Sequence, residues 1–231
     1  MGEGCPTCYK TKVKQEVKNL LIVVIAAVLS IIPAMARDAE VSVNAGAGVS
    51  GYSGETNGNL RFAYRVGVGV DVPFPSVWGL RTGLNFEQIG SKNALRIPVG
   101  DFDFGELVET SLATTTRQYY LELPVMASAG IALGGEQAVV FSFGPYLAYG
   151  VGGKSKTTYN AAGGQTEISD DVFGDGDNSL RRFDFGLGAG AELQINRHFS
   201  VGLDSRLGLR HLQAHSESSN YAIFATVGYR F

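Results

Sequence analysis

The sequence predicts an all-β fold, an eight-stranded antiparallel up-and-down transmembrane β-barrel with short periplasmic turns and longer extracellular loops. Three observations predict it. Eight segments alternate apolar and polar residues with the period of two that a β-strand requires. Most of them reach the length of about 9–11 residues that a tilted strand needs to cross a bilayer. Short links also alternate with long ones along the chain, and a sheet that faces lipid must close on itself, with eight as the smallest common strand number.

The first two strands are expected over residues 39–52 and 60–72. The second is the clearest, because one of its faces is wholly apolar and the other is polar or very small. The apolar face of residues 60–72 consists of Leu60, Phe62, Tyr64, Val66, Val68, Val70 and Val72, and the opposite face of Arg61, Ala63, Arg65, Gly67, Gly69 and Asp71. Such a two-faced strand suits a wall between lipid and a polar lumen.

The remaining six strands show the same alternation and follow in chain order. They are expected over residues 78–89, 116–131, 138–152, 182–195, 198–210 and 220–231. In the fifth strand, for example, Phe141, Phe143 and Leu147 alternate with Ser142 and Gly144. No segment after residue 36 shows the 3.6-residue period of a competing amphipathic helix.

The links sort by length in the way that a membrane barrel requires. Those after the second, fourth and sixth strands are short, whereas residues 90–115 and 153–181 are expected to form long loops. Short periplasmic turns and longer outer loops are the normal asymmetry of outer-membrane barrels. With an even strand number, both termini would then face the periplasm.

The N-terminus is interpreted as a cleaved signal peptide, residues 1–36, that precedes a barrel domain over residues 37–231. Four lysines precede an apolar run over residues 20–32, and an A-x-A site at Ala34 and Ala36 follows. A transmembrane anchor is the alternative, but the run is shorter than the roughly 20 residues that span a bilayer. The Cys5–Cys8 pair would leave with the signal peptide.

Charge and composition exclude several classes of protein. Removal of residues 1–36, with four lysines and two glutamates, changes the formal net charge from −3 to −5. An acidic chain gives no reason to expect nucleic-acid binding. The segment 170–178 is acidic and rich in glycine, but its glycine spacing does not match a calcium-binding EF-hand loop. No metal and no cofactor are predicted.

Enzymatic chemistry is not expected either. His198 and Ser200 form a His-x-Ser pair on a predicted strand, and a histidine base can activate a serine nucleophile in some lipid-modifying barrels. Both side chains are predicted to point inward near a periplasmic turn. Such an enzyme would need its site at the outer leaflet, so catalysis by this pair is not favoured.

Charged residues gather on the predicted inner face. They are Arg61, Arg65, Asp71, Arg81, Glu87, Glu122, Asp184, Glu192, Asp204, Arg206, Arg210 and Arg230. Mixed charges in a confined space should pair, because a buried unpaired charge is expensive. An eight-stranded interior is just wide enough for side chains to fill it. The favoured interpretation is a plugged, salt-bridged lumen, and a conducting pore is the alternative.

The last strand ends in an aromatic residue and carries apolar side chains at every second position. The positions are Tyr221, Ile223, Val227, Tyr229 and Phe231. This pattern resembles the C-terminal β-signal that the outer-membrane assembly machinery recognises, where an apolar strand can pair with an exposed strand edge. That machinery, periplasmic chaperones during biogenesis and outer-membrane lipid are therefore the expected partners. Trp78, Phe74 and Phe199 would join Tyr229 and Phe231 in an aromatic girdle at the periplasmic interface.

Four stretches also resemble a known family. They are Gly79–Phe86 (GLRTGLNF), Tyr120–Val125 (YLELPV), Gly144–Gly150 (GPYLAYG) and Asp184–Gly190 (DFGLGAG). They are similar to the porin family, or PorT-like outer-membrane β-barrel proteins, common in Bacteroidetes, and the resemblance covers residues 37–231. It implies an eight-stranded barrel in the outer membrane of a Gram-negative bacterium. One branch of the family is tied to a secretion system, and most members have no defined activity.

The expected function is that of a non-enzymatic, monomeric outer-membrane barrel, structural or surface-binding, that presents its two long loops to the outside. Loops on a rigid scaffold are common binding sites. The alternatives are a narrow porin-like channel, an accessory barrel of a transport or secretion complex, and a soluble lipocalin-like barrel. A soluble barrel would place its apolar face inward and its polar face outward and would need no terminal β-signal, and the wholly apolar strand faces weigh against it.

Overall fold

A computed structural model describes most of the chain after residue 38. The described residues are 39–54, 59–100, 107–161, 164–173, 179–212 and 218–231. Residues Glu40–Phe231 form one compact unit. The predicted signal peptide and its cleavage residues Ala34 and Ala36 lie outside the described residues. Within the described part of the chain, no helix is long and apolar enough to span a membrane.

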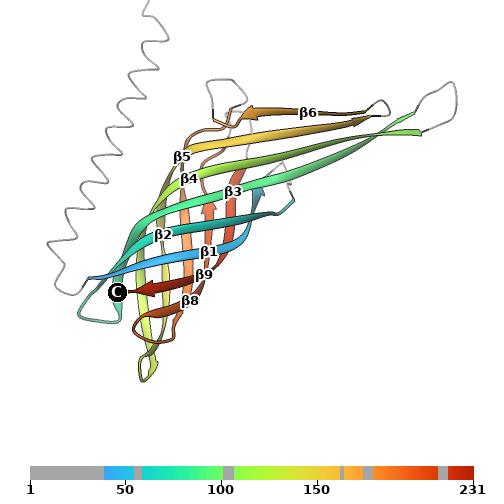
Figure 1. Ribbon diagram of the computed structural model, residues 1–231. Coiled ribbons are helices and arrows are strands. Elements are labelled where there is room, and N and C mark those ends of the chain that lie inside the picture. The colour runs from blue at the N-terminus through green and yellow to red at the C-terminus, as the bar shows by residue number, and fades with distance from the viewer. Residues whose placement is uncertain (1–38, 55–58, 101–106, 162–163, 174–178, 213–217) are drawn as a thin grey trace, which may run out of the picture. The chain divides into compact units, whose positions relative to one another are not determined.

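The described residues of this unit form nine antiparallel strands, and eight of them close into a ring (Figure 1). The strands are β1 (Glu40–Ser53), β2 (Arg61–Pro73), β3 (Trp78–Gly100), β4 (Leu107–Gly134), β5 (Gln137–Ala161), β6 (Gly164–Asp171), β7 (Phe183–Gln194), β8 (Phe199–Gly208) and β9 (Ser219–Arg230). Each strand of the ring pairs with its neighbour in sequence, except that β5 pairs with β7 and β1 closes the ring on β9. The predicted eight-stranded barrel is therefore confirmed.

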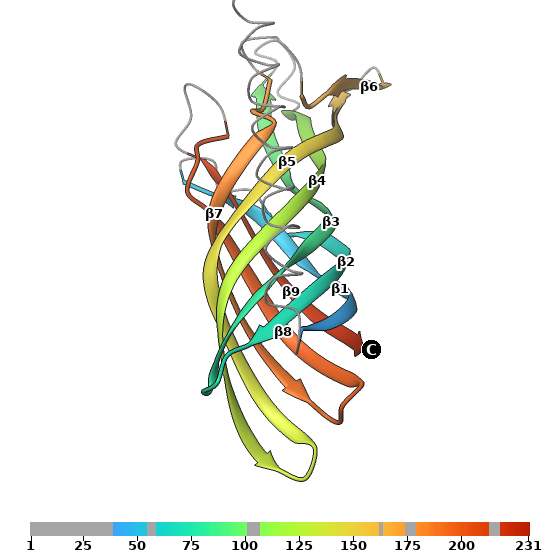
Figure 2. The same cartoon turned by 90° about the vertical axis from the view of Figure 1, so that its left-hand side faces the viewer.

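The prediction of two long loops, over residues 90–115 and 153–181, is wrong over most of their length, because strands occupy it. β3 continues to Gly100 and pairs with β4 from Leu107 onward, and β5 continues to Ala161 and pairs with β6. We name the paired part beyond the ring the extension sheet. It comprises residues 90–100 of β3, 107–117 of β4, 153–161 of β5 and all of β6, which lies beside β5 and outside the ring in Figure 2.

Polar residues on both faces explain why the alternation did not reveal the extensions of β4 and β5. Residues 114–116 are three threonines in succession, and Thr157 and Thr158 follow the same pattern on β5. Threonine favours the extended backbone because it is β-branched, but it gives no contrast between faces. In the backbone ladder Thr114 pairs with Thr157 and Thr116 with Ser155. The side-chain hydroxyl oxygens of these two pairs lie 3.2 and 3.4 Å apart.

The outer face of the ring is apolar and exposed, whereas the inner face is buried. On β2, Phe62 is 63% exposed and Ala63, the next residue, is fully buried. On β3, Leu84 is exposed and Glu87 is fully buried. A contiguous apolar exterior around a polar interior is the reverse of a soluble protein and is expected of a barrel that faces lipid.

The two ends of the ring differ. At the end where β1 begins and β9 ends, which we call the terminal end, the Phe231 N–H donates to the Val41 carbonyl at 3.0 Å. The links there are short, and Gly134 and Gly135, with φ of 119° and 62°, turn β4 into β5. Phe199, Tyr229 and Phe231 stack edge to face at the same end, with ring centroids 5.2 Å apart in each pair. Three of the five residues of the predicted aromatic girdle thus contact one another at this end of the ring.

Candidate functional site: the lumen and its mouth

Six charged side chains meet in the middle of the ring. We call them the central cluster: Arg65 (β2), Glu87 (β3), Glu122 (β4), Asp184 (β7), Asp204 and Arg206 (β8). The Arg206 guanidinium bonds to Glu87, approaches Glu122 at 3.1 Å and approaches Asp184 at 3.2 Å. Its side chain is 2% exposed. The ring thus buries one guanidinium among three carboxylates that come from three other strands.

Polar neighbours also donate hydrogen bonds to three of the carboxylates. Asn85 donates to Glu122 at 3.1 Å, and Asn220 donates to Asp184 at 3.1 Å. The Thr226 hydroxyl donates to Asp204 at 3.1 Å, and Arg65 reaches the same carboxylate at 2.7 Å. Because these donors come from several strands, the cluster ties opposite walls of the ring together.

Aromatic rings flank both arginines of the central cluster. The Arg206 guanidinium lies 4.3 Å from the centroid of Tyr146 and 5.7 Å from that of Tyr120. The Arg65 guanidinium lies 5.3 Å from the ring of Phe224. Cation–π contacts of this kind strengthen when water is excluded. Small residues make the room: a Cβ on Gly186 would lie 2.8 Å from the Tyr146 ring.

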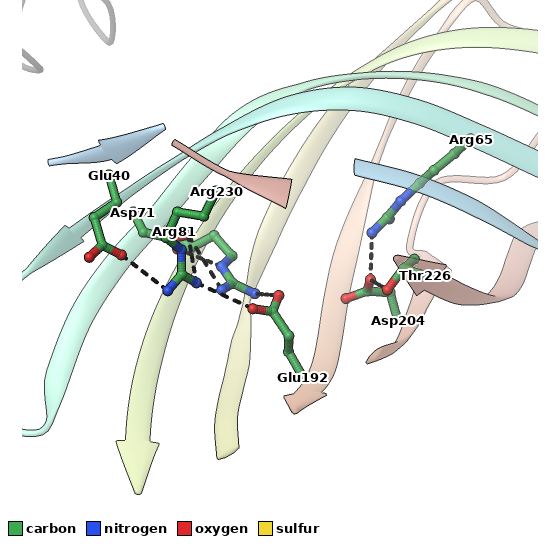
Figure 3. Close-up of polar contacts among 8 residues, drawn as sticks. All are labelled: Glu40, Arg65, Asp71, Arg81, Glu192, Asp204, Thr226 and Arg230. Carbon is green, nitrogen blue, oxygen red and sulfur yellow. Dashed lines mark hydrogen bonds and ion pairs between the residues drawn. The ribbon is translucent and has the colours of Figure 1, made fainter. Parts of the chain in front are cut away.

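A second group, the terminal cluster, lies toward the terminal end (Figure 3). Its members are Glu40, Asp71, Arg81, Glu192 and Arg230. Arg81 contacts Asp71 at 2.6 Å and Glu192 at 2.9 Å. Arg230 contacts Glu40 at 3.1 Å and Glu192 at 3.4 Å. The first and last strands are therefore cross-linked by charge as well as by their backbone ladder.

A polar cavity of about 70 Å³ lies between the two clusters. Arg65 and Glu122 line it from the central cluster, and Arg81, Glu192 and Arg230 from the terminal cluster. This volume accommodates a few water molecules.

Ten of the twelve predicted lumen charges lie in these two clusters, and two depart from the prediction. The Arg61 guanidinium donates to the Thr116 carbonyl at 2.9 Å, without a carboxylate partner within 4.0 Å among the described residues. Arg210 lies just beyond β8, where its guanidinium stacks over the ring of Phe183 at 5.5 Å. Both residues lie near the end of the ring that carries the extension sheet, where side chains can reach past the lumen wall.

A small apolar cluster, which we call the cap, packs on the core of the ring at the end that carries the extension sheet. Val172 and Phe173, which directly follow β6, are 4% and 5% exposed and pack with Leu180. The Phe173 ring meets Tyr120 edge to face at 5.6 Å. The Arg182 guanidinium lies over the Phe173 ring, 5.4 Å from its centroid, and donates to the Phe173 carbonyl at 3.3 Å.

This cap was not predicted from the sequence. The signal was an apolar pair, Val172 and Phe173, inside an otherwise acidic and glycine-rich segment. Gly150 is the matching feature on β5, because a Cβ there would collide with the Phe173 ring. Below the cap, Tyr120, Tyr146 and Phe224 continue the packed core down to the central cluster.

The His198–Ser200 pair is not assembled as a catalytic pair. The His198 ring is exposed and stacks on Tyr229 at 5.6 Å, and its Nδ1 contacts the Arg230 carbonyl at 3.0 Å. The prediction that His198 points inward is thus wrong, because the aromatic group at the terminal end provides its packing surface. Ser200 does line the lumen cavity.

The acidic segment 170–178 is split by the fold. Asp170 and Asp171 belong to β6, whereas residues 174–178 lie outside the described residues. The described residues hold no group of three or more side chains arranged to bind a metal ion.

The positions of the predicted C-terminal signal lie on β9 and just beyond it. Ile223, Val227, Tyr229 and Phe231 are exposed large hydrophobic residues, and Tyr221 is half-buried. Their strand pairs with β1 on one side and β8 on the other.

Comparisons with known proteins agree with the geometry. The family model described as outer membrane protein beta-barrel domain matches residues 30–213. No curated protein sequence matches the chain. Neisserial surface protein A is 10% identical, covers 84% of this chain and 100% of its own, and has a TM-score of 0.44.

Two further solved structures are similar at the same low level. Ail, the attachment invasion locus protein of Yersinia pestis, is 15% identical over 83% of this chain and 98% of its own, with a TM-score of 0.39. A major outer membrane protein from Thermus thermophilus is 16% identical over 84% of this chain and 100% of its own, with a TM-score of 0.40. At these values no ligand or activity is carried over to this chain.

Proposed function

Because this chain belongs to the outer membrane protein beta-barrel domain family, we propose that it is a non-enzymatic barrel of the Gram-negative outer membrane that holds an exposed binding surface on a closed, rigid ring. The binding surface of the proposal is the extension sheet. The observation that carries the proposal is the contrast between a filled lumen and a four-stranded sheet that continues past it.

Three layers support a closed lumen. Phe173 and Val172 cover one end, the central cluster fills the middle, and the terminal cluster fills the other end. The cavity between the clusters is about 70 Å³. A water path through the ring would have to displace side chains in every layer. A narrow porin-like channel is therefore the weaker candidate.

The exposed edge of β6 supports a binding role. All eight residues of β6 are exposed, and within the described residues the strand pairs only with β5. A free edge offers backbone N–H and C=O groups to an incoming strand. The accessory-barrel alternative uses the same edge, with a component of a transport or secretion complex as partner.

Cross-linking on intact cells tests this proposal. After residue 36 the sequence holds three lysines, Lys92, Lys154 and Lys156, and all lie on the extension sheet. An amine-reactive cross-linker therefore reports on this sheet and on the N-terminal amine. We expect protein partners cross-linked to these lysines. The control variant replaces residues 158–167 by an Asn-Gly turn between the paired residues Thr157 and Ile168, which keeps all three lysines and removes the outer half of β6.

The outcomes separate the candidates. Partners that cross-link to the native chain but not to the shortened variant support binding along β6. Absence of any partner, or partners unchanged by the shortening, contradicts it. Planar-bilayer recordings test the lumen independently: we expect no conductance steps from the native chain, and reproducible steps would favour the channel.

The two ends of the chain carry a proposal about biogenesis. We propose that residues 1–36 are removed as a signal peptide, that the exposed apolar positions of β9 are recognised by the assembly machinery, and that the barrel then remains a monomer in lipid. Intact-mass measurement of the purified membrane protein should give an N-terminus at Arg37. Replacing Phe231 by Ser should reduce the heat-modifiable fraction in the outer membrane; an unchanged fraction would contradict the role of β9.

A further inference from the structure

The cations of the extension sheet gather on one of its faces. Arg117 (β4) lies directly opposite Lys154 (β5), and Thr115 lies opposite both Lys92 (β3) and Lys156 (β5). Residues directly opposite in a ladder share a face, and so do residues two apart on a strand. Lys92, Arg117, Lys154 and Lys156 therefore project to the same side, and all four are exposed. We call this set the basic rim.

The basic rim continues the apolar outer face of the ring. On β4, Tyr119 and Leu121 lie on the same face as Arg117 and closer to the middle of the ring. The Tyr119 ring stacks on Phe86 at a centroid distance of 5.9 Å. On β5 a bulge lies opposite Tyr119 and Tyr120, where Tyr120 pairs with Gly150 and Tyr119 with Gly152. The extra residue, Val151, is 44% exposed. The bulge thus keeps Lys154 on the outer face.

The height of the rim corresponds to the headgroup region of a membrane. Aromatic side chains of membrane barrels lie at the interface between hydrocarbon and headgroups. Arg117 is two residues beyond Tyr119, a distance of about 7 Å along a strand. The rim therefore begins where lipid phosphates are expected.

Two cations of the rim, Arg117 and Lys154, lie directly opposite each other in the ladder. Like charges directly opposite in a ladder destabilise it. Asp171 on β6 lies directly opposite Lys154 on its other side, but among the described residues neither Arg117 nor Lys154 forms an ion pair within 4.0 Å. Lys156, by contrast, pairs with Glu167 at 2.8 Å. An external anion would relieve the repulsion.

We propose that the basic rim binds the phosphate groups of a phosphorylated glycolipid in the outer leaflet, beside the aromatic band of β3 and β4. Lysine suits this role because its ammonium is a compact charge that binds phosphate without fixed geometry. The lumen uses arginine alone as its cation, so the lysines are confined to the surface that would meet headgroups. This proposal needs the membrane location of the barrel but not a protein partner for β6.

Lipid titration tests the proposal. The folded chain in neutral detergent micelles is titrated with bisphosphoryl lipid A and with the same lipid after dephosphorylation, and bound lipid is counted by native mass spectrometry. We expect the phosphorylated lipid to bind more tightly, and more weakly as salt is raised. Equal binding of the two lipids would overturn the proposal. Displacement of the lipid by an equal concentration of inorganic phosphate would overturn the assignment to lipid and leave a free-phosphate site.

A triple variant, Lys92→Gln with Arg117→Gln and Lys154→Gln, locates the binding. Each cation near a membrane surface contributes about fivefold in affinity, so the triple variant should bind on the order of a hundredfold more weakly. The matched control is Arg197→Gln, an exposed arginine at the terminal end, which should bind as the native chain does. Native-like binding by the triple variant would refute the assignment.

Two checks protect this test from a folding defect. The triple variant must keep the gel shift between unheated and boiled samples that marks a closed barrel. A charge-retaining variant, Lys92→Arg with Lys154→Arg, should keep the affinity within about twofold, because the attraction depends on charge near the surface. A large loss in this variant would contradict an electrostatic origin. If the native chain cross-links to no protein partner but still binds the phosphorylated lipid, the proposed protein partner of β6 is disproved and this inference stands.

Discussion

The central cluster and the extension sheet share strands, but the cluster buries its charged side chains and the extension sheet exposes them. β3 carries Glu87 inside the ring and Lys92 outside it, and β4 carries Glu122 and Arg117 in the same way. Inside, charges are buried and each arginine contacts more than one carboxylate. Outside, the Lys156–Glu167 pair is about half exposed on both sides.

The difference teaches where charge contributes to stability in this fold. A buried charge that loses its partner costs several kcal/mol, whereas an exposed pair is worth about 0–1 kcal/mol. The lumen charges should therefore decide whether the ring survives. The charges of the extension sheet should decide what it binds.

The strongest test of this contrast is Arg206→Ala. The substitution leaves Glu87, Glu122 and Asp184 buried around a missing cation, so we expect the free energy of unfolding to fall by about 3–5 kcal/mol. Urea titration of the chain refolded in lipid vesicles measures it. The control is Arg197→Ala, which breaks an exposed ion pair between Arg197 and Glu136 with an N···O distance of 2.8 Å. It should lower the free energy of unfolding by less than about 1 kcal/mol. Equal losses in the two variants would remove the contrast.

Phe173→Ala should have the next largest effect. Truncation of a packed phenylalanine costs about 3–5 kcal/mol in a core, but the cap can detach while the ring stays closed, so we expect a smaller global loss. The local effect should be larger. Hydrogen exchange should accelerate at the Val172 and Gly150 amides, which bond to the Gly153 and Arg182 carbonyls at 3.1 and 2.6 Å. Unchanged exchange at both amides would show that Phe173 does not hold the cap.

Shortening the β3–β4 hairpin should leave the ring nearly as stable as before. Replacing residues 94–113 by an Asn-Gly turn joins the paired residues Asn93 and Thr114. We expect a change of about 1 kcal/mol or less in the unfolding free energy, the scale of loop-length effects. A loss as large as that of Arg206→Ala, in the same urea titration, would mean that the extension sheet supports the ring.

Lys156→Ala should produce the smallest change. The Lys156–Glu167 pair is about half exposed, so its removal should cost roughly 0.2–1 kcal/mol. The effect should vanish when the unfolding titration is repeated at about 1 M salt, where the screening length is near 3 Å. An effect that persists at high salt would indicate a packing contribution of the lysine stem.

The ring and most of its lumen charges were predictable because both leave a periodic signal. Burial of one strand face forces alternation, so Arg81 and Glu192 could be assigned to the inner face from parity alone. Their partners are set by which walls face each other across the ring. The alternation along a strand tells which face a residue lies on but not which residue lies across the ring from it. The division into two clusters is therefore seen only in the structure.

The extension sheet and the cap were not predictable by the same reasoning. Thr114 to Thr116 are polar on both faces, so no period marks them as a strand. Val172 and Phe173 form a two-residue apolar signal that is too short to have a period. Arg210 was assigned to the inner face because the alternation of inward and outward side chains was extended beyond Gly208, where β8 ends. Alternation identifies strands that separate two environments, and these segments do not.

The pairing of β1 with β9 also constrains how the molecule is made. Ser42 pairs with Arg230, so the contact that closes the ring joins the two ends of the described strands. Contacts between residues so distant in sequence raise the contact order and slow folding. Every other neighbour in the ring forms a hairpin or near-hairpin that can assemble locally. The intermediate expected on this pathway is an open sheet with two unsatisfied edges, and the time it persists sets the window in which it can aggregate.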